Sequence, residues 1–212
     1  MKGGPVSISE LFNQRADEYD AWFRDNPLIL ASEIEAVRQV TPPFTRALEV
    51  GVGTGRFAQA LGVPLGVEPS EAMAAYARAR GIQVVPGHAE ALPFPDAYFD
   101  AVFMITVDCY LEDLAPALEE CHRVLMDQGH LILAHIDIDA PLGRVYEEER
   151  DRDPFYRNAF FRGSREVLEQ ITQAGFEPGA IRQTIESFDN VFQPVRPGYG
   201  DGVFVALCAV KS

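Results

Sequence analysis

The stretch Leu48-Glu49-Val50-Gly51-Val52-Gly53-Thr54-Gly55-Arg56 decides the fold of this chain. The apolar run 47–50 predicts a short strand, the glycines predict a tight turn, and the residues after Arg56 have helical apolar spacing. Glycines in such a turn adopt conformations closed to other residues and let a ligand approach the backbone. The free amides of the following helix attract polar or anionic groups. The stretch therefore indicates a ligand site, although glycines also build turns that bind nothing.

Downstream of this turn, strand-like and helix-like segments alternate. The strand-like runs are 65–67, 82–85, 101–105 and 131–136, and the helical patterns between them are 56–61, 70–80 and 114–125. Short apolar strands separated by helices predict a parallel sheet that is covered on both faces.

The two ends of the chain follow other patterns. Ser7 to Glu10 fits a capping box before an amphipathic helix, and Pro27 begins a second helix that Pro42 and Pro43 end. Near the C-terminus, a helix over 164–174 precedes strands near 181–188 and 203–210. Because the loop between these strands is too short for a crossover helix, we expect an antiparallel pair.

These patterns predict a single domain over residues 1–212 with a doubly wound, Rossmann-like α/β fold. Its sheet is mostly parallel with an antiparallel last strand, and residues 1–43 add two helices as an N-terminal cap. Residues 141–163 interrupt the alternation and are rich in aromatic side chains, which suggests a lid insertion, although packing of these rings against the sheet would explain them equally well. The length of 212 residues also fits one domain.

Charge limits the classes of partner. Lys and Arg number 18 against 32 Asp and Glu, which gives a net charge of −14. Such a chain repels nucleic-acid phosphates and anionic lipids, so we expect neither as a partner. A neutral or cationic small molecule is the favoured partner, while solubility alone would also explain the acidity.

The cysteines and the apolar runs indicate a compartment. Cys109, Cys121 and Cys208 are far apart and form no CxxC pair, so neither a disulfide framework nor a zinc site is expected. The N-terminus lacks the apolar stretch of a signal peptide, and no apolar run approaches the length of a membrane span. We expect a cytoplasmic protein.

A second acid strengthens the ligand interpretation of the glycine turn. Glu68 ends the second strand-like run, where a carboxylate can accept hydrogen bonds from both ribose hydroxyls of a nucleoside. The alternative is a solvated glutamate at a strand end.

Taken together, these residues resemble the class I S-adenosylmethionine-dependent methyltransferases, particularly the small-molecule branch that includes the quinone-ring methylases. The family pattern of strand, E/D-x-G-x-G-x-G, helix and acid-ended strand is matched by residues 49–55 and 66–70. The later family blocks are matched by Ala89–Phe94, Phe99–Val102 and Arg123–Leu125, and the opening motif by Tyr19–Phe23. The resemblance covers almost the whole chain.

The resemblance implies roles for particular residues around S-adenosylmethionine and its product S-adenosylhomocysteine. The glycines would line the methionyl part, Glu49 would help to hold its ammonium group, and Glu68 would bind the ribose. Ala89 and Glu90 would border the adenine, and the backbone of Ile105 would contact the methionyl amine. The implied cofactor-binding set is Tyr19, Glu49, Gly51, Gly53, Gly55, Glu68, Pro69, His88, Ala89, Glu90 and Ile105.

One position departs from the family pattern. His88 stands where the family commonly has an aspartate that binds the adenine amino group. Glu90 or a backbone carbonyl could replace that acceptor, and an imidazole could accept the bond only in its neutral form.

Methyl transfer needs alignment, exclusion of water and sometimes removal of a proton from the acceptor. Candidate bases should follow the fourth and fifth strands, which selects Asp108, Tyr110, His135, Asp137 and Asp139. His135 is the first candidate because an unperturbed imidazole titrates near neutral pH. A structural histidine at a strand end is the alternative. Three residues at one strand end make a poor ligand set, so no metal is expected.

Two other functions stay open at this point. A nicotinamide-dependent oxidoreductase also uses a glycine turn and a strand-end acid, but Arg56 stands where its fingerprint needs glycine or alanine. A non-catalytic S-adenosylmethionine-binding protein would keep the same binding residues. Our leading interpretation is a methyltransferase with a small-molecule acceptor, whose identity the residues do not specify.

Overall fold

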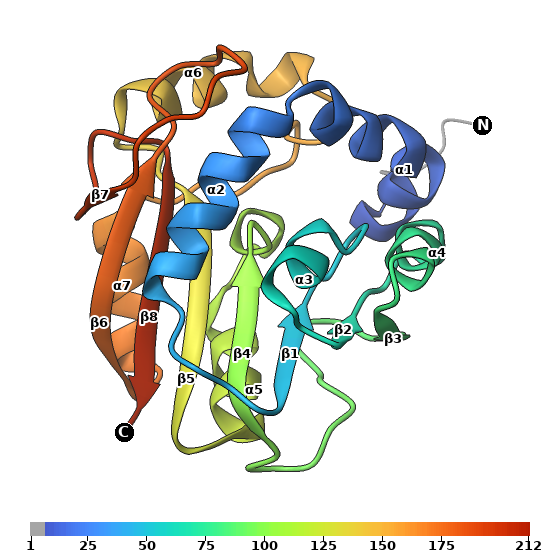
Figure 1. Ribbon diagram of the computed structural model, residues 1–212, viewed down its shortest axis with the longest axis vertical. Helices are drawn as coiled ribbons and strands as arrows, with labels where there is room; N and C mark the ends of the chain where they lie inside the picture. Colours follow the sequence, from blue (N-terminus) through green and yellow to red (C-terminus); the bar gives the residue numbers. More distant parts are fainter. Residues whose placement is uncertain (1–6) are drawn as a thin grey trace.

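The computed structural model describes residues 7–212, so the first six residues of the expected N-terminal cap lie outside the described part of the chain. The molecule is built around one sheet with the strand order β3-β2-β1-β4-β5-β8-β6-β7 (Figure 1). The strands are β1 (Ala47–Val50), β2 (Leu65–Val67), β3 (Gln83–Val85), β4 (Phe99–Ile105), β5 (Leu125–Ile136), β6 (Phe176–Thr184), β7 (Arg196–Pro197) and β8 (Phe204–Lys211).

The predicted mixture of parallel and antiparallel strands is confirmed. Strands β3, β2, β1, β4 and β5 pair in parallel, whereas β8 runs antiparallel to both β5 and β6. The carboxyl ends of the parallel strands therefore meet at one edge of the sheet, which is where ligands bind in open α/β folds.

Helices cover both faces of the sheet (Figure 1). The helices are α1 (Ile8–Asp25), α2 (Pro27–Val40), α3 (Arg56–Leu61), α4 (Glu71–Ala79), α5 (Ala115–Val124), α6 (Pro141–Glu149) and α7 (Ser164–Gln173), with short 3₁₀ turns at Asp108–Tyr110 and Arg150–Arg152. Strand side chains alternate between the two layers. Phe103 packs in the core under α2 and α3, whereas Val102 and Met104 pack in the core under α5 and α7.

The N-terminal helices form as predicted, and α1 has a kink. The Ser7 hydroxyl accepts a hydrogen bond from the Glu10 N–H at 3.2 Å and caps α1. Arg15 leaves helical geometry with φ −126° and ψ 21°, so α1 changes direction there.

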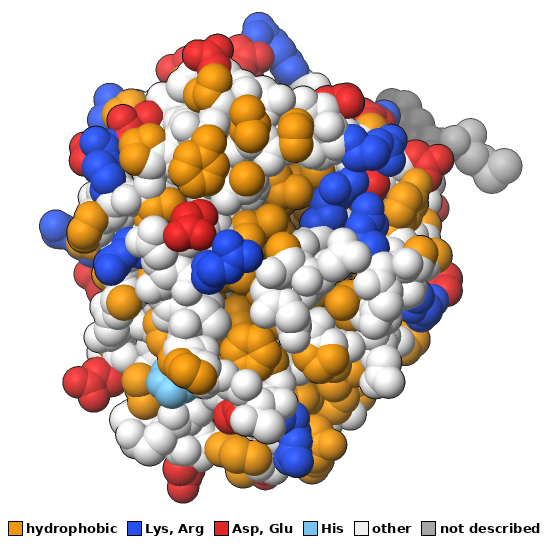
Figure 2. Space-filling model, viewed as in Figure 1, with side chains coloured by type: hydrophobic (Ala, Val, Ile, Leu, Met, Phe, Trp, Pro, Cys, Tyr) orange, Lys and Arg blue, Asp and Glu red, His pale blue; other side chains and the backbone are white. Residues whose placement is uncertain are grey.

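One buried ion cluster fixes the second half of α1. Asp20 is 1% exposed, and its carboxylate accepts hydrogen bonds from Arg56 at 2.8 Å and from Arg80 at 2.9 Å. Arg24 completes the cluster at 3.0 Å. Figure 2 shows basic side chains gathered between α1 and α3 on this face. Because Arg56 begins α3 and Arg80 follows α4, the cluster holds α1 over the edge of the sheet.

Strand β6 lies earlier in the chain than its predicted range. It ends at Thr184, because Ile185 takes a positive φ of 66° and residues 186–195 form a loop. The Gln193 side-chain carbonyl accepts hydrogen bonds from the Glu186 and Ser187 N–H groups, and these bonds replace a strand ladder. The insertion 141–163 contains α6 and the second 3₁₀ turn.

Among the described residues, no helix combines the length and the apolar character needed to cross a bilayer. Cys109, Cys121 and Cys208 are all buried, and none forms a disulfide.

Candidate active site

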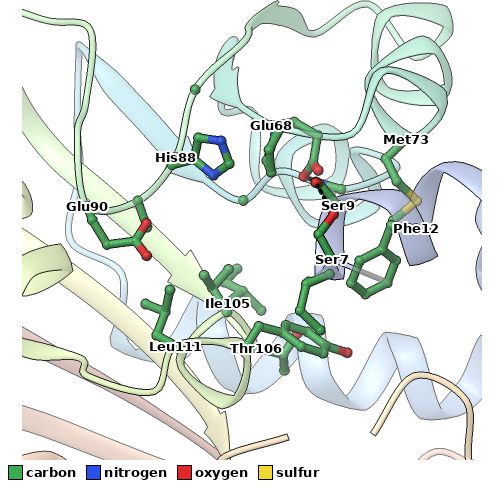
Figure 3. Close-up of a pocket in the computed structure, with 18 of the residues that line it drawn as sticks. Ser7, Ser9, Phe12, Glu68, Met73, His88, Glu90, Ile105, Thr106 and Leu111 are labelled. Carbon is green, nitrogen blue, oxygen red and sulfur yellow. Dashed lines mark hydrogen bonds between the residues drawn. The ribbon is translucent and has the colours of Figure 1, made fainter. Parts of the chain in front are cut away.

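A cavity of about 260 Å³ opens where β1, β2 and β4 end beneath α1. Figure 3 shows Glu68 and His88 on one side of this cavity and Ile105 and Leu111 across from them. We call it the first cavity. Its lining residues are Ser7, Ile8, Ser9, Phe12, Tyr19, Gly51, Gly53, Glu68, Pro69, Met73, Gly87, His88, Ala89, Glu90, Ile105, Thr106, Val107, Tyr110 and Leu111.

The glycines of the β1–α3 turn have different structural roles. Gly51 has φ +66°, and a β-carbon there would lie 2.5 Å from the Val107 side chain. Gly55 has φ +80°, and a β-carbon there would lie 2.9 Å from the Ala77 backbone. Close packing therefore requires glycine at both positions. Gly53 has φ +55° and lines the first cavity, and its added β-carbon would meet protein only at 3.5 Å. Because Gly53 has no side chain, a ligand can approach the backbone there.

Glu68 connects this turn to the start of α4. One carboxylate oxygen accepts from the Gly53 N–H and the other from the Ser70 N–H, each at 2.9 Å. Burial raises the pKa of Glu68, and the two N–H donors and His88 oppose that rise. Each carboxylate oxygen can accept a second hydrogen bond, so both can still receive donors from a ligand in the first cavity.

Glu49 lies within the sheet and does not line the first cavity. It is 2% exposed, and its Oε2 has no hydrogen-bond partner among the residues described. Burial raises its pKa well above the ordinary value, and the Glu68 charge adds to the rise. An unsatisfied buried oxygen of this kind requires a donor from water or from a ligand.

The structure brings most of the expected binding residues together. Of the predicted set, all except Glu49 and Gly55 line the first cavity. Sequence reasoning missed Phe12, Met73 and Thr106, among others. In the sequence, Phe12 and Met73 show only the apolar spacing that is typical of a helix. Thr106 has a positive φ of 52°, which no sequence signal marks.

A second cavity, of about 450 Å³, adjoins the first. Tyr19 and Thr106 line both. The lining residues of the second cavity are Glu18, Tyr19, Trp22, Phe23, Ile29, Glu33, Phe57, Thr106, Ile136, Val145, Tyr146, Glu149, Asp153, Pro154, Phe155, Tyr156, Ile185, Phe188, Val203 and Phe204. Many of its lining residues are aromatic, and they come mainly from α1, α2, α3, the insertion 141–163, the loop after β6 and the ends of β5 and β8.

His135 does not occupy the position expected of a base. It is 0% exposed and lines neither cavity, because its neighbours Ala134 and Ile136 face the α2–α3 layer and it projects to the opposite one. Its Nε2 lies 3.1 Å from the Ser164 hydroxyl, which donates to Asp137 at 2.7 Å. Burial lowers the pKa of His135. These contacts match the structural alternative.

Two of the other candidate bases at strand ends are also buried. Asp137 is 0% exposed and accepts from Ser164, and Asp108 is 1% exposed with no partner on either oxygen among residues 7–212. Burial raises the pKa of Asp108 to about 7. Among the five candidate bases, only Tyr110 lines either the first or the second cavity. Within the described range, no group of three or more His, Cys, Asp or Glu side chains is placed to hold a metal ion.

Comparisons with known proteins agree with this geometry. The family model for a methyltransferase domain matches residues 48–133. A crystal structure of an S-adenosylmethionine-dependent methyltransferase from Thermotoga maritima, described as a possible histamine N-methyltransferase, is 39% identical. It superimposes with a TM-score of 0.93 over 97% of this chain and 100% of that one.

Two curated relatives cover nearly the whole chain. An uncharacterized protein of Methanocaldococcus jannaschii is 42% identical over 95% of this chain and 98% of its own length. A ubiquinone/menaquinone biosynthesis C-methyltransferase of Methylobacterium nodulans is 32% identical over 97% of this chain and 89% of its own. The chain belongs to the S-adenosylmethionine-dependent methyltransferases. It is an enzyme that uses S-adenosylmethionine as its cosubstrate.

Proposed function

We propose that the first cavity binds S-adenosylmethionine and that the second cavity binds a small-molecule methyl acceptor. One observation carries this proposal: the two cavities adjoin, with Tyr19 and Thr106 in the wall of each. A donor in one cavity and an acceptor in the other would face each other across this junction. Their arrangement supports direct transfer of the methyl group.

The residues of the first cavity would orient the methyl donor. Glu68 would bind the ribose hydroxyls, and His88, Ala89 and Glu90 would border the adenine. The glycine turn would pass along the methionyl part, with Glu49 acting behind it through a bridging donor. Acid groups near the sulfonium and the ammonium of the donor would favour its binding over that of anionic nucleotides.

Methyl transfer requires that the acceptor atom is aligned with the methyl group and that water is excluded. The acceptor atom attacks the methyl carbon, and the carbon–sulfur electron pair passes to sulfur, which leaves as the thioether of S-adenosylhomocysteine. The aromatic walls of the second cavity would exclude water from this step. The insertion 141–163 supplies Tyr146 and Tyr156 to that wall, which supports the proposed lid.

Calorimetric titration tests the proposal. We expect S-adenosylhomocysteine to bind the wild-type protein, and NAD not to bind. Tight binding of NAD without binding of S-adenosylhomocysteine would favour the oxidoreductase alternative. Failure to methylate any member of a broad acceptor panel, with S-adenosylhomocysteine bound, would favour a non-catalytic binding protein.

A further inference from the structure

Glu33 is an unpaired carboxylate in the wall of the second cavity. It extends from α2, and no hydrogen bond or ion pair to its side chain occurs among residues 7–212. Burial alone raises its pKa, which agrees with the lack of a partner. Glu33 is only partly exposed in the free protein. A ligand that filled the cavity would remove water from this carboxylate, and a cation would supply the partner that offsets the loss.

The other acids that line the second cavity already have partners. Glu18 forms an ion pair with Arg15 at 2.6 Å, and Glu149 forms one with Arg152 at 2.7 Å. Asp153 accepts a hydrogen bond from a backbone N–H. No Lys, Arg or His lines the cavity. The cavity lining therefore offers no positively charged side chain to an anion, and Glu33 is the acid available to a cation.

Aromatic rings line the same cavity as Glu33. The Tyr146 ring packs against Tyr156 at 5.5 Å and against Phe188 at 5.7 Å between ring centroids. Tyr146 and Glu33 line the same cavity. Burial raises the pKa of Tyr146, and the Glu33 charge raises it further. Ring faces attract organic cations, and desolvated sites strengthen that attraction.

The geometry points to an organic amine as the acceptor, bound as its ammonium ion in the second cavity by the Glu33 carboxylate and the aromatic walls. This inference rests on the proposed function, because the amine needs a methyl donor in the first cavity. A neutral planar ring would also fit aromatic walls, but it would leave Glu33 buried and unpaired. An anion would meet the Glu33 charge with no basic group to offset it.

Glu33 would also receive the proton that the reaction must remove. The ammonium ion transfers one proton to the carboxylate, and the freed nitrogen lone pair forms a bond to the methyl carbon. The carbon–sulfur bond breaks with its electron pair on sulfur, and the product leaves as an N-methylammonium ion. Glu33 then returns its proton to water. Burial raises the pKa of Glu33, which makes its carboxylate a stronger base for this transfer.

A charge series tests this assignment directly. Trp22 is the single tryptophan and lines the second cavity, so its fluorescence reports on binding there. Protein saturated with S-adenosylhomocysteine is titrated with 2-phenylethylamine, 2-phenylethanol and phenylacetate, which are alike in size. The pair hexylamine and 1-hexanol repeats the comparison without a ring. We expect each amine to bind about tenfold or more tightly than its alcohol, and phenylacetate to bind most weakly.

Glu33→Gln keeps the shape of the side chain and removes its charge. We expect amine affinity to fall about tenfold, to the level of the alcohol, while alcohol affinity stays unchanged. Glu35→Gln is the matched control, since Glu35 lies on the same helix, pairs with Arg38 and does not line the cavity. Unchanged affinity for S-adenosylhomocysteine in both variants shows that they are folded.

Equal binding of amine and alcohol, no binding of either amine, or an unchanged amine affinity in Glu33→Gln would overturn the inference. Each of these results, with S-adenosylhomocysteine bound, leaves the proposed function standing. Failure of S-adenosylhomocysteine to bind the wild-type protein would instead overturn the proposed function.

Discussion

The carboxylate of Glu68, just after β2, accepts a hydrogen bond from the backbone N–H of Gly53, in the turn after β1, at 2.9 Å. The same carboxylate accepts from Ser70 at the start of α4. One side chain therefore fixes the position of two loops that border the first cavity, besides facing the cavity itself. Its loss should affect both ligand binding and loop geometry.

Replacement of Glu68 should weaken binding of the cofactor product. Charge-assisted hydrogen bonds contribute about 1.5–3 kcal/mol each, so we expect Glu68→Ala to lower S-adenosylhomocysteine affinity by about tenfold or more. Glu68→Gln retains one acceptor oxygen, so its affinity for S-adenosylhomocysteine should lie between those of Glu68→Ala and the wild-type protein. Calorimetry measures these affinities. The control is Glu71→Ala, because Glu71 is exposed and pairs only with Arg78. Wild-type affinity in Glu68→Ala would contradict the assignment.

Two glycines with the same backbone requirement test the role of the turn. Gly53 and Gly62 both have positive φ, at 55° and 77°, and both have space for a β-carbon. Alanine at either position should cost about 1–2 kcal/mol of unfolding free energy from backbone strain. Only Gly53→Ala should also weaken S-adenosylhomocysteine binding, because only Gly53 lines the first cavity. Denaturant unfolding and calorimetry give the two quantities. Equal affinities in both variants would mean that Gly53 serves only the turn.

The Asp20 cluster should control how firmly α1 covers the first cavity. Burial opposes ionisation of Asp20, but hydrogen bonds from Arg56 and the charges of Arg56 and Arg80 outweigh it and lower the pKa. Asp20→Asn leaves two half-buried guanidinium groups without their counter-ion, so we expect a loss of about 3 kcal/mol and weaker cofactor binding.

The pH dependence of the Asp20 effect has a definite sign. Because the folded-state pKa is lowered, the stabilisation is present above the unfolded-state pKa and is lost as pH falls through the folded-state value. The stability difference between wild type and Asp20→Asn should therefore shrink in acid. Arg24→Ala should cost much less, since Arg24 is 56% exposed. A constant difference from pH 7 to pH 3 would argue against an ionised Asp20.

Glu33 should make the free protein less stable as pH rises. Its pKa is raised from 4.5 to about 8 in the folded state, so folding favours the protonated form. The stabilisation is complete below the unfolded-state pKa and is lost as pH rises through about 8. Glu33→Gln should match wild type near pH 4 and melt a few degrees higher at pH 9, in thermal unfolding without ligand. A melting difference that does not grow over this range would refute the shift.

Local patterns in the sequence were enough to predict the sheet, its parallel centre and the residues around the glycine turn. Strand, turn and acid lie within residues 47–68, so local spacing determines how they meet. The end of β6 was misplaced because Ile185 and Phe188 continue an apolar pattern, whereas a positive φ at Ile185 and the Gln193 side chain end the strand. Neither feature leaves a signal in the sequence.

The second cavity was not predictable as a site. In the sequence, Glu33 is one of several charged residues on an amphipathic helix, and Tyr146 is one of several aromatic residues in the insertion. They line one cavity only because α2 and α6 lie toward the same end of the sheet, although more than half of the chain separates them in sequence. His135 shows how strand alternation can move a residue away from the position that its sequence context suggests. Its place at a strand end suggested a base, but strand alternation turned it to the opposite layer, where Ser164 and Asp137 surround it.

A crystal structure of the protein with S-adenosylhomocysteine and 2-phenylethylamine bound tests the central claim most directly. We expect the ribose hydroxyls within hydrogen-bond distance of Glu68, the adenine beside His88 to Glu90, and the thioether sulfur at the junction formed by Tyr19 and Thr106. The amine nitrogen should lie at Glu33, on the side of the sulfur from which the methyl group leaves. A sulfur atom that points away from the second cavity, or an amine bound elsewhere, would contradict the account.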